Sequence, residues 1–247
     1  MTMIVNQPQN AGRMTCLQII QAACRRIGIL APTLAVGSYD QQIIQLLALC
    51  EEEGQELADR YPWQGLQNEV LFVTVAAQVQ TTLSATAPGF NYIVNNTIWN
   101  RTLRRPVYGP TSEQDWQQKK AIQLNGPFNS FRIVGDTINF YPNPAANQAC
   151  AFEYISRNWI TTSTSATSAF WTSDADLPNI SDQLIILGLI WRWKAAKGLD
   201  YAEDFAKYER KIADAMARDA GKPKLNMDGA TYEISPAVLV PRGSWLS

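Results

Sequence analysis

Carboxylates are the side chains in this sequence that could still carry acid–base chemistry. The sequence contains no histidine, so the commonest general base and every Ser-His or Cys-His nucleophile pair are missing. The densest acidic cluster is Glu51, Glu52, Glu53 and Glu56. Two carboxylates about 5 to 10 Å apart can act as acid and base in glycoside cleavage. On the helix expected here, however, these glutamates spread around the solvent side beside the apolar face of Cys50 and Leu57, so we favour a solvated face over catalysis.

A second acidic pair could bind a metal. Asp174 and Asp176 form a D-x-D sequence whose oxygens could coordinate a divalent cation. Two such residues in a loop before a helix more often cap it or shape a turn, and we favour that role. The sequence has no phosphate-binding glycine loop and no nucleophile elbow. It therefore predicts no catalytic residue, no cofactor and no metal, and the protein is not expected to be an enzyme.

One basic cluster stands out. It consists of Arg101, Arg104 and Arg105, and it lies near the aromatic residues Tyr92, Trp99 and Tyr108. Arginines interleaved with aromatic rings can follow a nucleic-acid backbone while the rings stack on bases. The whole chain has a net charge of -1, which provides no long-range attraction for nucleic acid. We favour a salt-bridging surface between subunits and keep single-stranded nucleic-acid binding as an alternative.

Composition indicates a folded globular protein with few charges. Hydrophobic residues make up 46% of the 247 residues and charged residues 17%. No apolar run is long enough to span a membrane, and the polar N-terminus lacks the features of a secretory signal, so we expect assembly in a cytoplasm and no membrane partner. The four cysteines (Cys16, Cys24, Cys50 and Cys150) form no C-x-x-C pair and are expected to be buried free thiols.

Helical signals occur near both ends of the sequence. Thr15 can cap a helix that runs to Gly28, and Ser38 with Gln41 has the form of a capping box for a second helix that stops before Pro62. Two more helices are expected from Ser181 to Gly198 and from Tyr201 to Ala220.

Between these helices the pattern favours strands. Ser130–Val134 and Thr137–Tyr141 are joined by Gly135-Asp136, a two-residue loop typical of a hairpin. Ala149–Ile155 is expected to pair with this hairpin. Thr111 with Gln114 should cap a short helix that carries Trp116, Lys119 and Lys120.

The predicted fold class is therefore α+β: a four-helix α-bundle with a β-rich insertion between helices 2 and 3 and an extended C-terminal arm. The expected domains are a flexible N-terminus at 1–14, a helical bundle at 15–65 and 177–221, an inserted lobe at 66–176, and the arm at 222–247.

Two regions are predicted to contact other chains. The helix around Ile190, Trp191 and Trp193 is apolar on nearly every side, so it must be buried all round or shared with a neighbouring subunit. The proline-rich arm carries apolar residues that would be exposed in a free tail, and such surface usually marks a docking site. These arm residues are Ile234, Val238, Leu239, Val240 and Trp245. Within the arm, residues 239–244 also spell a thrombin-cleavage sequence of the kind left by cloning, and we favour a natural tail over such a remnant.

The order of several sequence strings resembles one known family. The string Ala58-Asp-Arg-Tyr-Pro-Trp63 ends the second helix and precedes a β insertion. It is followed by the hairpin Phe131-Arg-Ile-Val-Gly-Asp-Thr-Ile-Asn-Phe-Tyr-Pro142 and by Phe152-Glu-Tyr-Ile-Ser156. Together they resemble head-to-tail adaptor proteins of tailed phages, in particular the tail accessory factors of short-tailed phages.

The resemblance implies a helical bundle with an inserted β lobe, assembled as a dodecameric ring beneath the portal of the virion. The implied partners are the portal protein, a tail nozzle or tail-tube protein, further copies of the chain, and double-stranded DNA in transient passage. The resemblance brings no catalytic residues. The alternatives are a virion-associated, carboxylate-dependent cell-wall glycosidase and a single-stranded nucleic-acid-binding protein.

Overall fold

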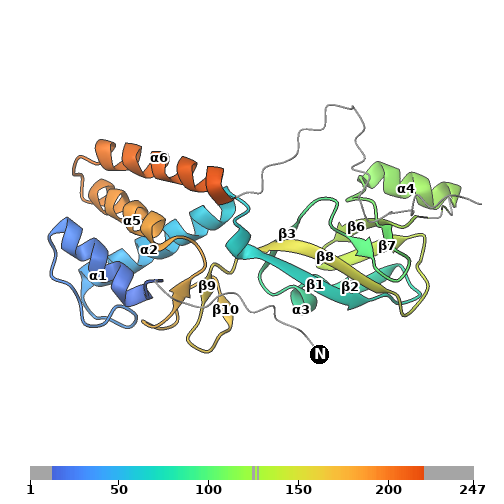
Figure 1. The fold of residues 1–247 in the computed structure, drawn as a ribbon, viewed down its shortest axis with the longest axis horizontal. Helices are drawn as coiled ribbons and strands as arrows, with labels where there is room; N and C mark the ends of the chain where they lie inside the picture. The colour runs from blue at the N-terminus through green and yellow to red at the C-terminus, as the bar shows by residue number, and fades with distance from the viewer. Residues whose placement is uncertain (1–12, 124–125, 127, 220–247) are drawn as a thin grey trace, which may run out of the picture.

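The computed structural model describes residues 13–123, 126 and 128–219. Within them the fold is mixed α+β, with six helices and three small antiparallel sheets. The helices are α1 (Cys16–Ile27), α2 (Gln41–Arg60), α3 (Leu83–Thr86), α4 (Glu113–Ile122), α5 (Asp182–Ala196) and α6 (Ala202–Asp219). Four of them gather at one end of an elongated molecule, and most of the strands lie at the other end (Figure 1). No helix in the described ranges is long and apolar enough to cross a membrane.

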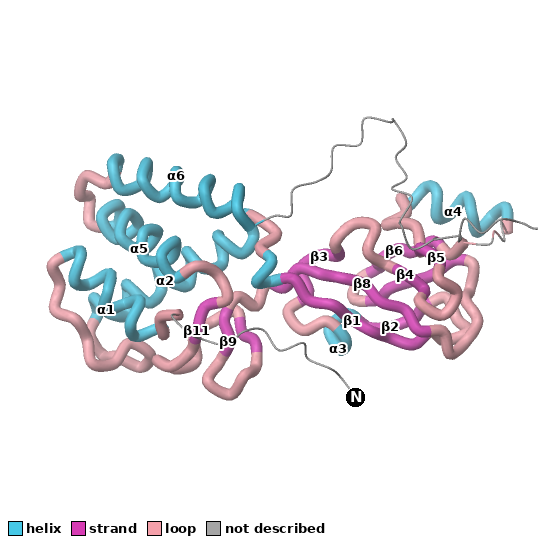
Figure 2. The backbone as a smooth tube through the Cα atoms, viewed as in Figure 1, coloured by secondary structure: helices cyan, strands magenta, loops and turns pink. Residues whose placement is uncertain are grey.

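The strands form one larger and two smaller sheets (Figure 2). Their bounds are β1 (Gln67–Val73), β2 (Val79–Thr82), β3 (Phe90–Ile93), β4 (Trp99–Asn100), β5 (Arg105–Pro106), β6 (Ser130–Val134), β7 (Thr137–Tyr141), β8 (Ala149–Ser156), β9 (Ile160–Thr161), β10 (Thr167–Ser168) and β11 (Leu177–Pro178). The largest sheet has the order β1-β8-β4-β5, with β3 also paired to β8. The others have the orders β2-β7-β6 and β10-β9-β11.

The predicted hairpin is confirmed, but its predicted third strand is not. Strands β6 and β7 pair around Gly135, whose positive φ of 57° suits the tight turn. The prediction that Ala149–Ile155 joins this hairpin was wrong: β8 pairs with β1, β3 and β4, and β2 takes the place beside β7. Strand β8 is buried along nearly its whole length, so it needs neighbours on both edges. The seven-residue β1 covers almost all of one edge, which the five-residue hairpin strands could not do.

Capping residues explain where the helices begin. Thr15 caps α1 and the helix ends at Gly28, as predicted. The structure adds that Gln18 completes a capping box and that Gly28 has a left-handed conformation. The N-cap of α2 is Asp40, whose carboxylate accepts from the Gln42 amide at 2.9 Å. The predicted cap Ser38 instead accepts from the Asp40 amide and shapes the preceding turn. Helix α2 stops at Arg60, before Pro62, as expected.

The short helix α4 begins one residue later than predicted. Ser112, and not Thr111, is its N-cap, because the Ser112 hydroxyl accepts from the Asp115 amide at 3.1 Å.

Two hydrophobic clusters hold the molecule together. The first joins α1, α2, α5 and α6, with α5 in contact with each of the other three helices. The second lies among the strands and contains residues of β1, β3, β6, β7 and β8. We call these the helical part, which includes the β9–β11 segment, and the β part, which covers β1 to β8 with α3 and α4. The α+β class is confirmed; a four-helix bundle is not clearly shown.

The segment after β8 returns to the helical part. The indole of Trp159 is fully buried there, in edge contact with Trp171 at a centroid distance of 4.9 Å. Gly54 of α2 leaves room for this indole, because a Cβ at that position would overlap it. The predicted lobe 66–176 includes both tryptophans, yet both pack in the helical cluster. The domain boundaries themselves stay a prediction.

Candidate functional site

The glutamate cluster on α2 builds a buried ion network. Glu53 is 0% exposed, and its carboxylate accepts from Arg192 Nε of α5 at 2.7 Å and from the Tyr208 hydroxyl of α6 at 2.5 Å. Arg192 also donates to Glu52 and Glu56 through its two terminal nitrogens. The solvated face predicted for this cluster is therefore wrong for Glu53. The network ties together three helices.

A glycine in α5 makes this arrangement possible. Gly188 interrupts the apolar run of α5, and a Cβ there would overlap the Glu53 carboxylate. The carboxylate thus occupies space that any larger residue at position 188 would fill. The glycine that interrupts the apolar run therefore leaves the space in which the Glu53 carboxylate is buried.

Burial and shared partners shift the pKa values of Glu53 and Tyr208 in this network. Burial raises the pKa of Glu53 above its usual value, while the hydrogen bonds from Arg192 and Tyr208 act in the opposite direction. Burial and the adjacent Glu53 charge also raise the pKa of the Tyr208 hydroxyl, which therefore stays a donor at neutral pH. Arg192 and Tyr208 enclose the Glu53 carboxylate. The network therefore stabilises its own buried charges.

Asp174 and Asp176 serve backbone turns, as expected. Asp174 accepts from the Ala35 and Val36 amides, the latter at 2.7 Å, and holds the α1–α2 loop. Asp176 is 0% exposed and accepts from the amides of Thr172, Ser173 and Ser163. Within the described ranges, no group of three or more Cys, Asp or Glu side chains is placed to hold a metal ion.

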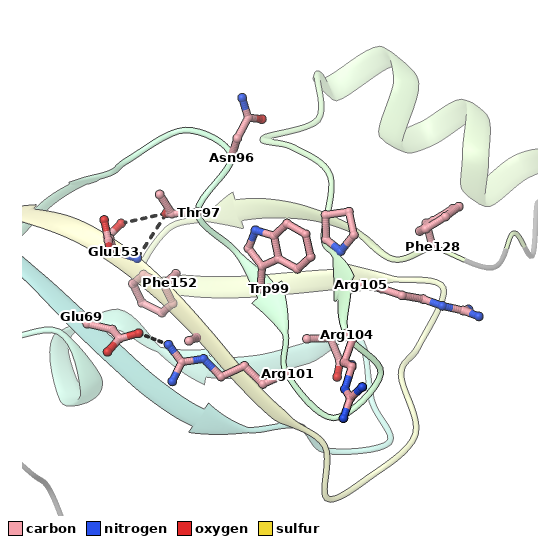
Figure 3. A pocket seen from close by; sticks show the side chains of 13 residues that line it. Glu69, Asn96, Thr97, Trp99, Arg101, Arg104, Arg105, Phe128, Phe152 and Glu153 are labelled. Carbon is pink, nitrogen blue, oxygen red and sulfur yellow. Dashed lines mark hydrogen bonds and ion pairs between the residues drawn. The ribbon is translucent and has the colours of Figure 1, made fainter. Parts of the chain in front are cut away.

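The basic cluster lines the largest pocket described, on the outer face of the main sheet (Figure 3). The pocket has a volume of about 980 Å³. Arg101, Arg104 and Arg105 all reach it, together with Trp99. Arg101 points toward Glu69 and forms an ion pair with it. The structure therefore brings together the three arginines and one of the three aromatic residues named with them.

Phe128 completes this pocket and was not predicted, because no helical or alternating pattern marks its segment. The Arg105 guanidinium lies 5.9 Å from the centre of the Phe128 ring, and Tyr108 meets the same ring edge-on at 5.4 Å. Tyr92 lines a different pocket, between β3 and the hairpin. Arg104 has a positive φ of 54°, a conformation that non-glycine residues adopt rarely.

Charges around this pocket largely balance. Three arginines and two acids, Glu69 and Glu153, line it, and Arg101 is the arginine that pairs with Glu69. Next to it on the same face, Leu71 of β1 is 63% exposed and Val73 is also exposed. A mixed surface of arginines, acids, aromatic rings and aliphatic side chains is typical of protein–protein contacts.

The predicted interface residues of α5 have different environments. Ile190 and Trp193 are buried in the chain's own core. Trp191 is half-buried and packs against Tyr201, Phe205 and Tyr208 of the α6 region. A contact with a neighbouring subunit through these residues stays a prediction.

The remaining predicted residues concern the arm and the cysteines. The arm residues named above lie outside the described part of the chain, so their docking stays a prediction.

The four cysteines are buried free thiols, as expected. Burial raises the pKa of the Cys50 thiol to about 12 and that of Cys150 to about 11.

Comparison with known proteins identifies the family. No curated protein matches the sequence closely. The sequence does match the family model described as SU10 adaptor protein, over residues 14–235. This match includes both hydrophobic clusters and both candidate sites described above. Because it extends over most of the chain, the protein belongs to the SU10 adaptor protein family, a family of phage head–tail adaptor proteins.

Proposed function

We propose that this chain is one subunit of an oligomeric ring, dodecameric by resemblance, that joins the portal to the tail of a phage and continues the DNA conduit. The match to the adaptor family over residues 14–235 carries this proposal. Family membership makes the chain a structural virion component that binds other virion components. Its proposed neighbours are the portal protein above and a tail nozzle or tail-tube protein below, with assembly in the host cytoplasm.

The same proposal assigns a role to each part of the fold. The helices α1, α2, α5 and α6 would form the bundle domain, and the β part would form the inserted lobe. In support, the four helices share one hydrophobic cluster and the strands share another. The arginine-lined pocket on the exposed sheet face would then contact a neighbouring subunit, because its balanced charges suit a protein surface.

Net charge supports a conduit rather than a DNA-binding site. The chain carries 21 Lys and Arg against 22 Asp and Glu. A strongly basic lumen would bind phosphates tightly and slow the passage of DNA. We therefore expect assembled rings to retain little DNA at physiological salt, and strong retention in a binding assay would contradict the conduit.

Single-stranded nucleic-acid binding is the second candidate. The observation in its favour is that Arg104 and Arg105 share a pocket with the rings of Trp99 and Phe128. If this candidate is right, salt-sensitive binding of an oligonucleotide should disappear in an Arg104→Ala/Arg105→Ala variant. If the adaptor proposal is right, neither protein should bind the oligonucleotide specifically.

No catalytic step is proposed. Glu53 is enclosed by Arg192 and Tyr208, and the carboxylates of Glu52 and Glu56 accept hydrogen bonds from the same guanidinium. A Glu52→Gln/Glu56→Gln variant should leave any cell-wall digestion by the virion unchanged. Loss of a real activity in that variant would favour the glycosidase alternative.

The arm is proposed to dock on the portal through its apolar residues. Deleting residues 227–247 should leave a folded protein that no longer binds portal rings. Loss of the cooperative unfolding transition in that variant would instead make the segment part of the core.

The decisive experiment measures mass in solution. Light scattering behind a sizing column would be recorded for the protein alone and after mixing with portal rings from the same phage. Co-elution with the portal in a fixed ratio is the expected result. A protein that stays monomeric and elutes apart from the portal would overturn the proposal.

A further inference from the structure

We propose that the open edge of strand β1 is a docking site for residues 231–235 of the same chain, which pair with it as an added antiparallel strand. The open edge consists of the main-chain N–H and C=O groups of Glu69, Leu71 and Val73 that point away from β8. The inference goes beyond the proposed function, because it concerns the chain by itself, before any contact with a portal.

Hydrogen bonds around β8 show which groups of β1 point outward. Just past β1, Thr74 donates its N–H to the Gln148 carbonyl at 2.9 Å. On the other edge of β8, the Ala149 carbonyl accepts from the Arg101 N–H at 2.8 Å. Main-chain groups of successive strand residues point to opposite edges. The even-numbered residues of β1 therefore face β8, and its odd-numbered residues face away from it.

The outward groups of β1 lack partners that the next outward residue has. At Val75, the Gln80 side chain accepts from the N–H at 3.0 Å and donates to the carbonyl at 3.2 Å. Along β1 itself, no described residue forms a hydrogen bond with the outward main-chain groups of Glu69, Leu71 and Val73. Strand β1 also stands at the end of its sheet. Its outer edge can therefore accept a further strand.

Strand β1 has none of the features that usually protect a sheet edge. Two other outer strands do: β5 has two residues and includes Pro106, and β2 has four residues and a register shift. By contrast, β1 has seven residues, pairs with β8 without a shift, and contains neither proline nor lysine. Its Leu71 and Val73 side chains are 63% and 59% exposed. A long, regular and apolar edge of this kind is suited to strand addition.

The end of α6 places residues 220–247 at the start of this edge. The Asp219 carboxylate accepts from the Gln64 N–H at 2.8 Å, and the Asp219 carbonyl accepts from the Gln64 side chain. Gln64 begins the short turn that leads into β1 at Gln67, and Figure 1 shows the end of α6 beside this turn. Strand β1 is about 24 Å long at its usual rise per residue. Residues 220–228 can span about 30 Å when extended, so the chain can reach the far end of β1 and return.

The sequence of this segment suits a returning strand. Asp228-Gly229 is a dipeptide typical of tight turns. Residues 231–235 then alternate polar and apolar side chains, and the apolar members are Tyr232 and Ile234. Pro236 follows and has no N–H to donate, so pairing would end there. This segment of the same chain is therefore the occupant that we assign to the open edge.

One register satisfies the edge and covers its exposed side chains. Tyr232 would pair with Val73, and Ile234 with Leu71. All four side chains then lie on the outer face of the sheet, where aromatic and aliphatic cross-strand pairs are favourable. The apolar residues of the arm after Pro236 are left for the portal.

Hydrogen exchange of single amides, followed by NMR, tests the docking. The full chain would be compared with a chain that lacks residues 227–247. The Leu71 and Val73 amides should exchange at least about tenfold more slowly in the full chain, because only there do they have an acceptor. The amides of Val70 and Phe72 face β8 and are the internal control, so their exchange should be the same in both chains.

Two proline variants test the pairing itself. Ile234→Pro removes an N–H that would donate to the Leu71 carbonyl, so it should abolish the slow exchange of the Leu71 and Val73 amides. Glu233→Pro removes an N–H that would point away from β1, so it should keep most of the slow exchange.

Crosslinking tests whether the segment belongs to the same chain. A chain with Val73→Cys/Tyr232→Cys should form an intramolecular link with a short bis-maleimide and remain a monomer. The native cysteines are buried, so their background reaction should be small. Leu103→Cys/Tyr232→Cys is the matched control, because Leu103 is exposed but lies beyond β4, away from β1. It should link at least tenfold more slowly.

Two outcomes would overturn the assignment. One is exchange of the Leu71 and Val73 amides that is equally fast with and without residues 227–247. The other is a link through Val73→Cys that forms only between two chains, which would make the occupant another copy. These measurements use no portal rings, so their result is independent of the light-scattering test of the proposed function.

Discussion

The helical part and the β part place their charges in opposite ways. Among the described residues, the buried charged side chains are Glu53, Asp176 and Arg192, and all three lie in the helical part. The buried polar side chains of the β part are uncharged, and its arginine cluster stands at the surface around a pocket.

Arginine therefore has a different role in each part: it stabilises the core in the helical part and lies at the surface in the β part. In the helical part, Arg192 binds three carboxylates and holds α2 and α5 together, while Tyr208 links Glu53 to α6. In the β part, Arg101 pairs with a half-exposed Glu69 in contact with water. A buried charge must be paired to be tolerated, whereas an exposed pair contributes little stability and remains available for contacts.

The largest expected effect comes from removing the buried cation. Arg192→Met should lower the free energy of unfolding by about 3 to 5 kcal/mol, because Glu53 would stay buried without its charge partner. The matched change Arg101→Met, at a half-exposed pair, should cost about 0 to 1 kcal/mol. Urea denaturation of the two variants measures both values, and similar losses would remove the contrast between the two parts.

A smaller loss is expected from the third member of the network. Tyr208→Phe keeps the ring in place but removes the hydroxyl that donates to Glu53, which should cost about 1.5 to 3 kcal/mol. Tyr201→Phe is the control, since its ring is partly exposed, and it should change stability by no more than about 0.5 kcal/mol. Equal midpoints of thermal unfolding for the two variants would show that the Tyr208 hydroxyl contributes nothing.

The other buried carboxylate should give the helical part a dependence on pH. Burial alone would raise the pKa of Asp176, but hydrogen bonds from Thr172, Ser173 and Ser163 outweigh it and hold that pKa below the usual range. Its contribution is therefore present above the unfolded-state pKa of about 4 and is lost as pH falls through the lower folded-state value.

Replacing the Asp176 carboxylate tests the expected direction of this pH dependence. Asp176→Asn should cost about 1 to 3 kcal/mol near neutral pH, and the difference from the unmodified protein should shrink as the pH falls below about 4. Chemical denaturation at several pH values measures this. A difference that stays constant, or that grows toward acid, would contradict the assignment.

The smallest effect is expected at the arginine-lined pocket. Arg104→Ala/Arg105→Ala should leave the urea midpoint nearly unchanged, within about 0.5 kcal/mol, because both side chains are exposed. A large loss of stability would mean that these arginines support the β part itself and are not a surface kept for contacts.

Local signals in the sequence predicted much of the fold. The cap at Thr15, the stop at Gly28 and the hairpin at Gly135 each depend on neighbours within a few residues, and all were confirmed. The caps at Ser38 and Thr111 were wrong because a better acceptor lay one or two residues further on.

The candidate sites were predicted less completely. The arginine cluster and Trp99 were predicted as a group and do line one pocket, whereas Phe128 comes from a distant segment and was missed. The partner strands of β8 were also missed, because an apolar strand of this length can pair with several others and the sequence does not rank them.

By itself, the sequence determined the α+β class, the positions of most helices, the shortage of charge and the adaptor family. Only the tertiary structure decided which carboxylate is buried. Glu53 and Arg192 are 139 residues apart in the sequence, and Glu53 resembles its exposed neighbours in every local respect. Its burial depends on the space left by Gly188 and on donors from two other helices, and these meet only when the chain has folded.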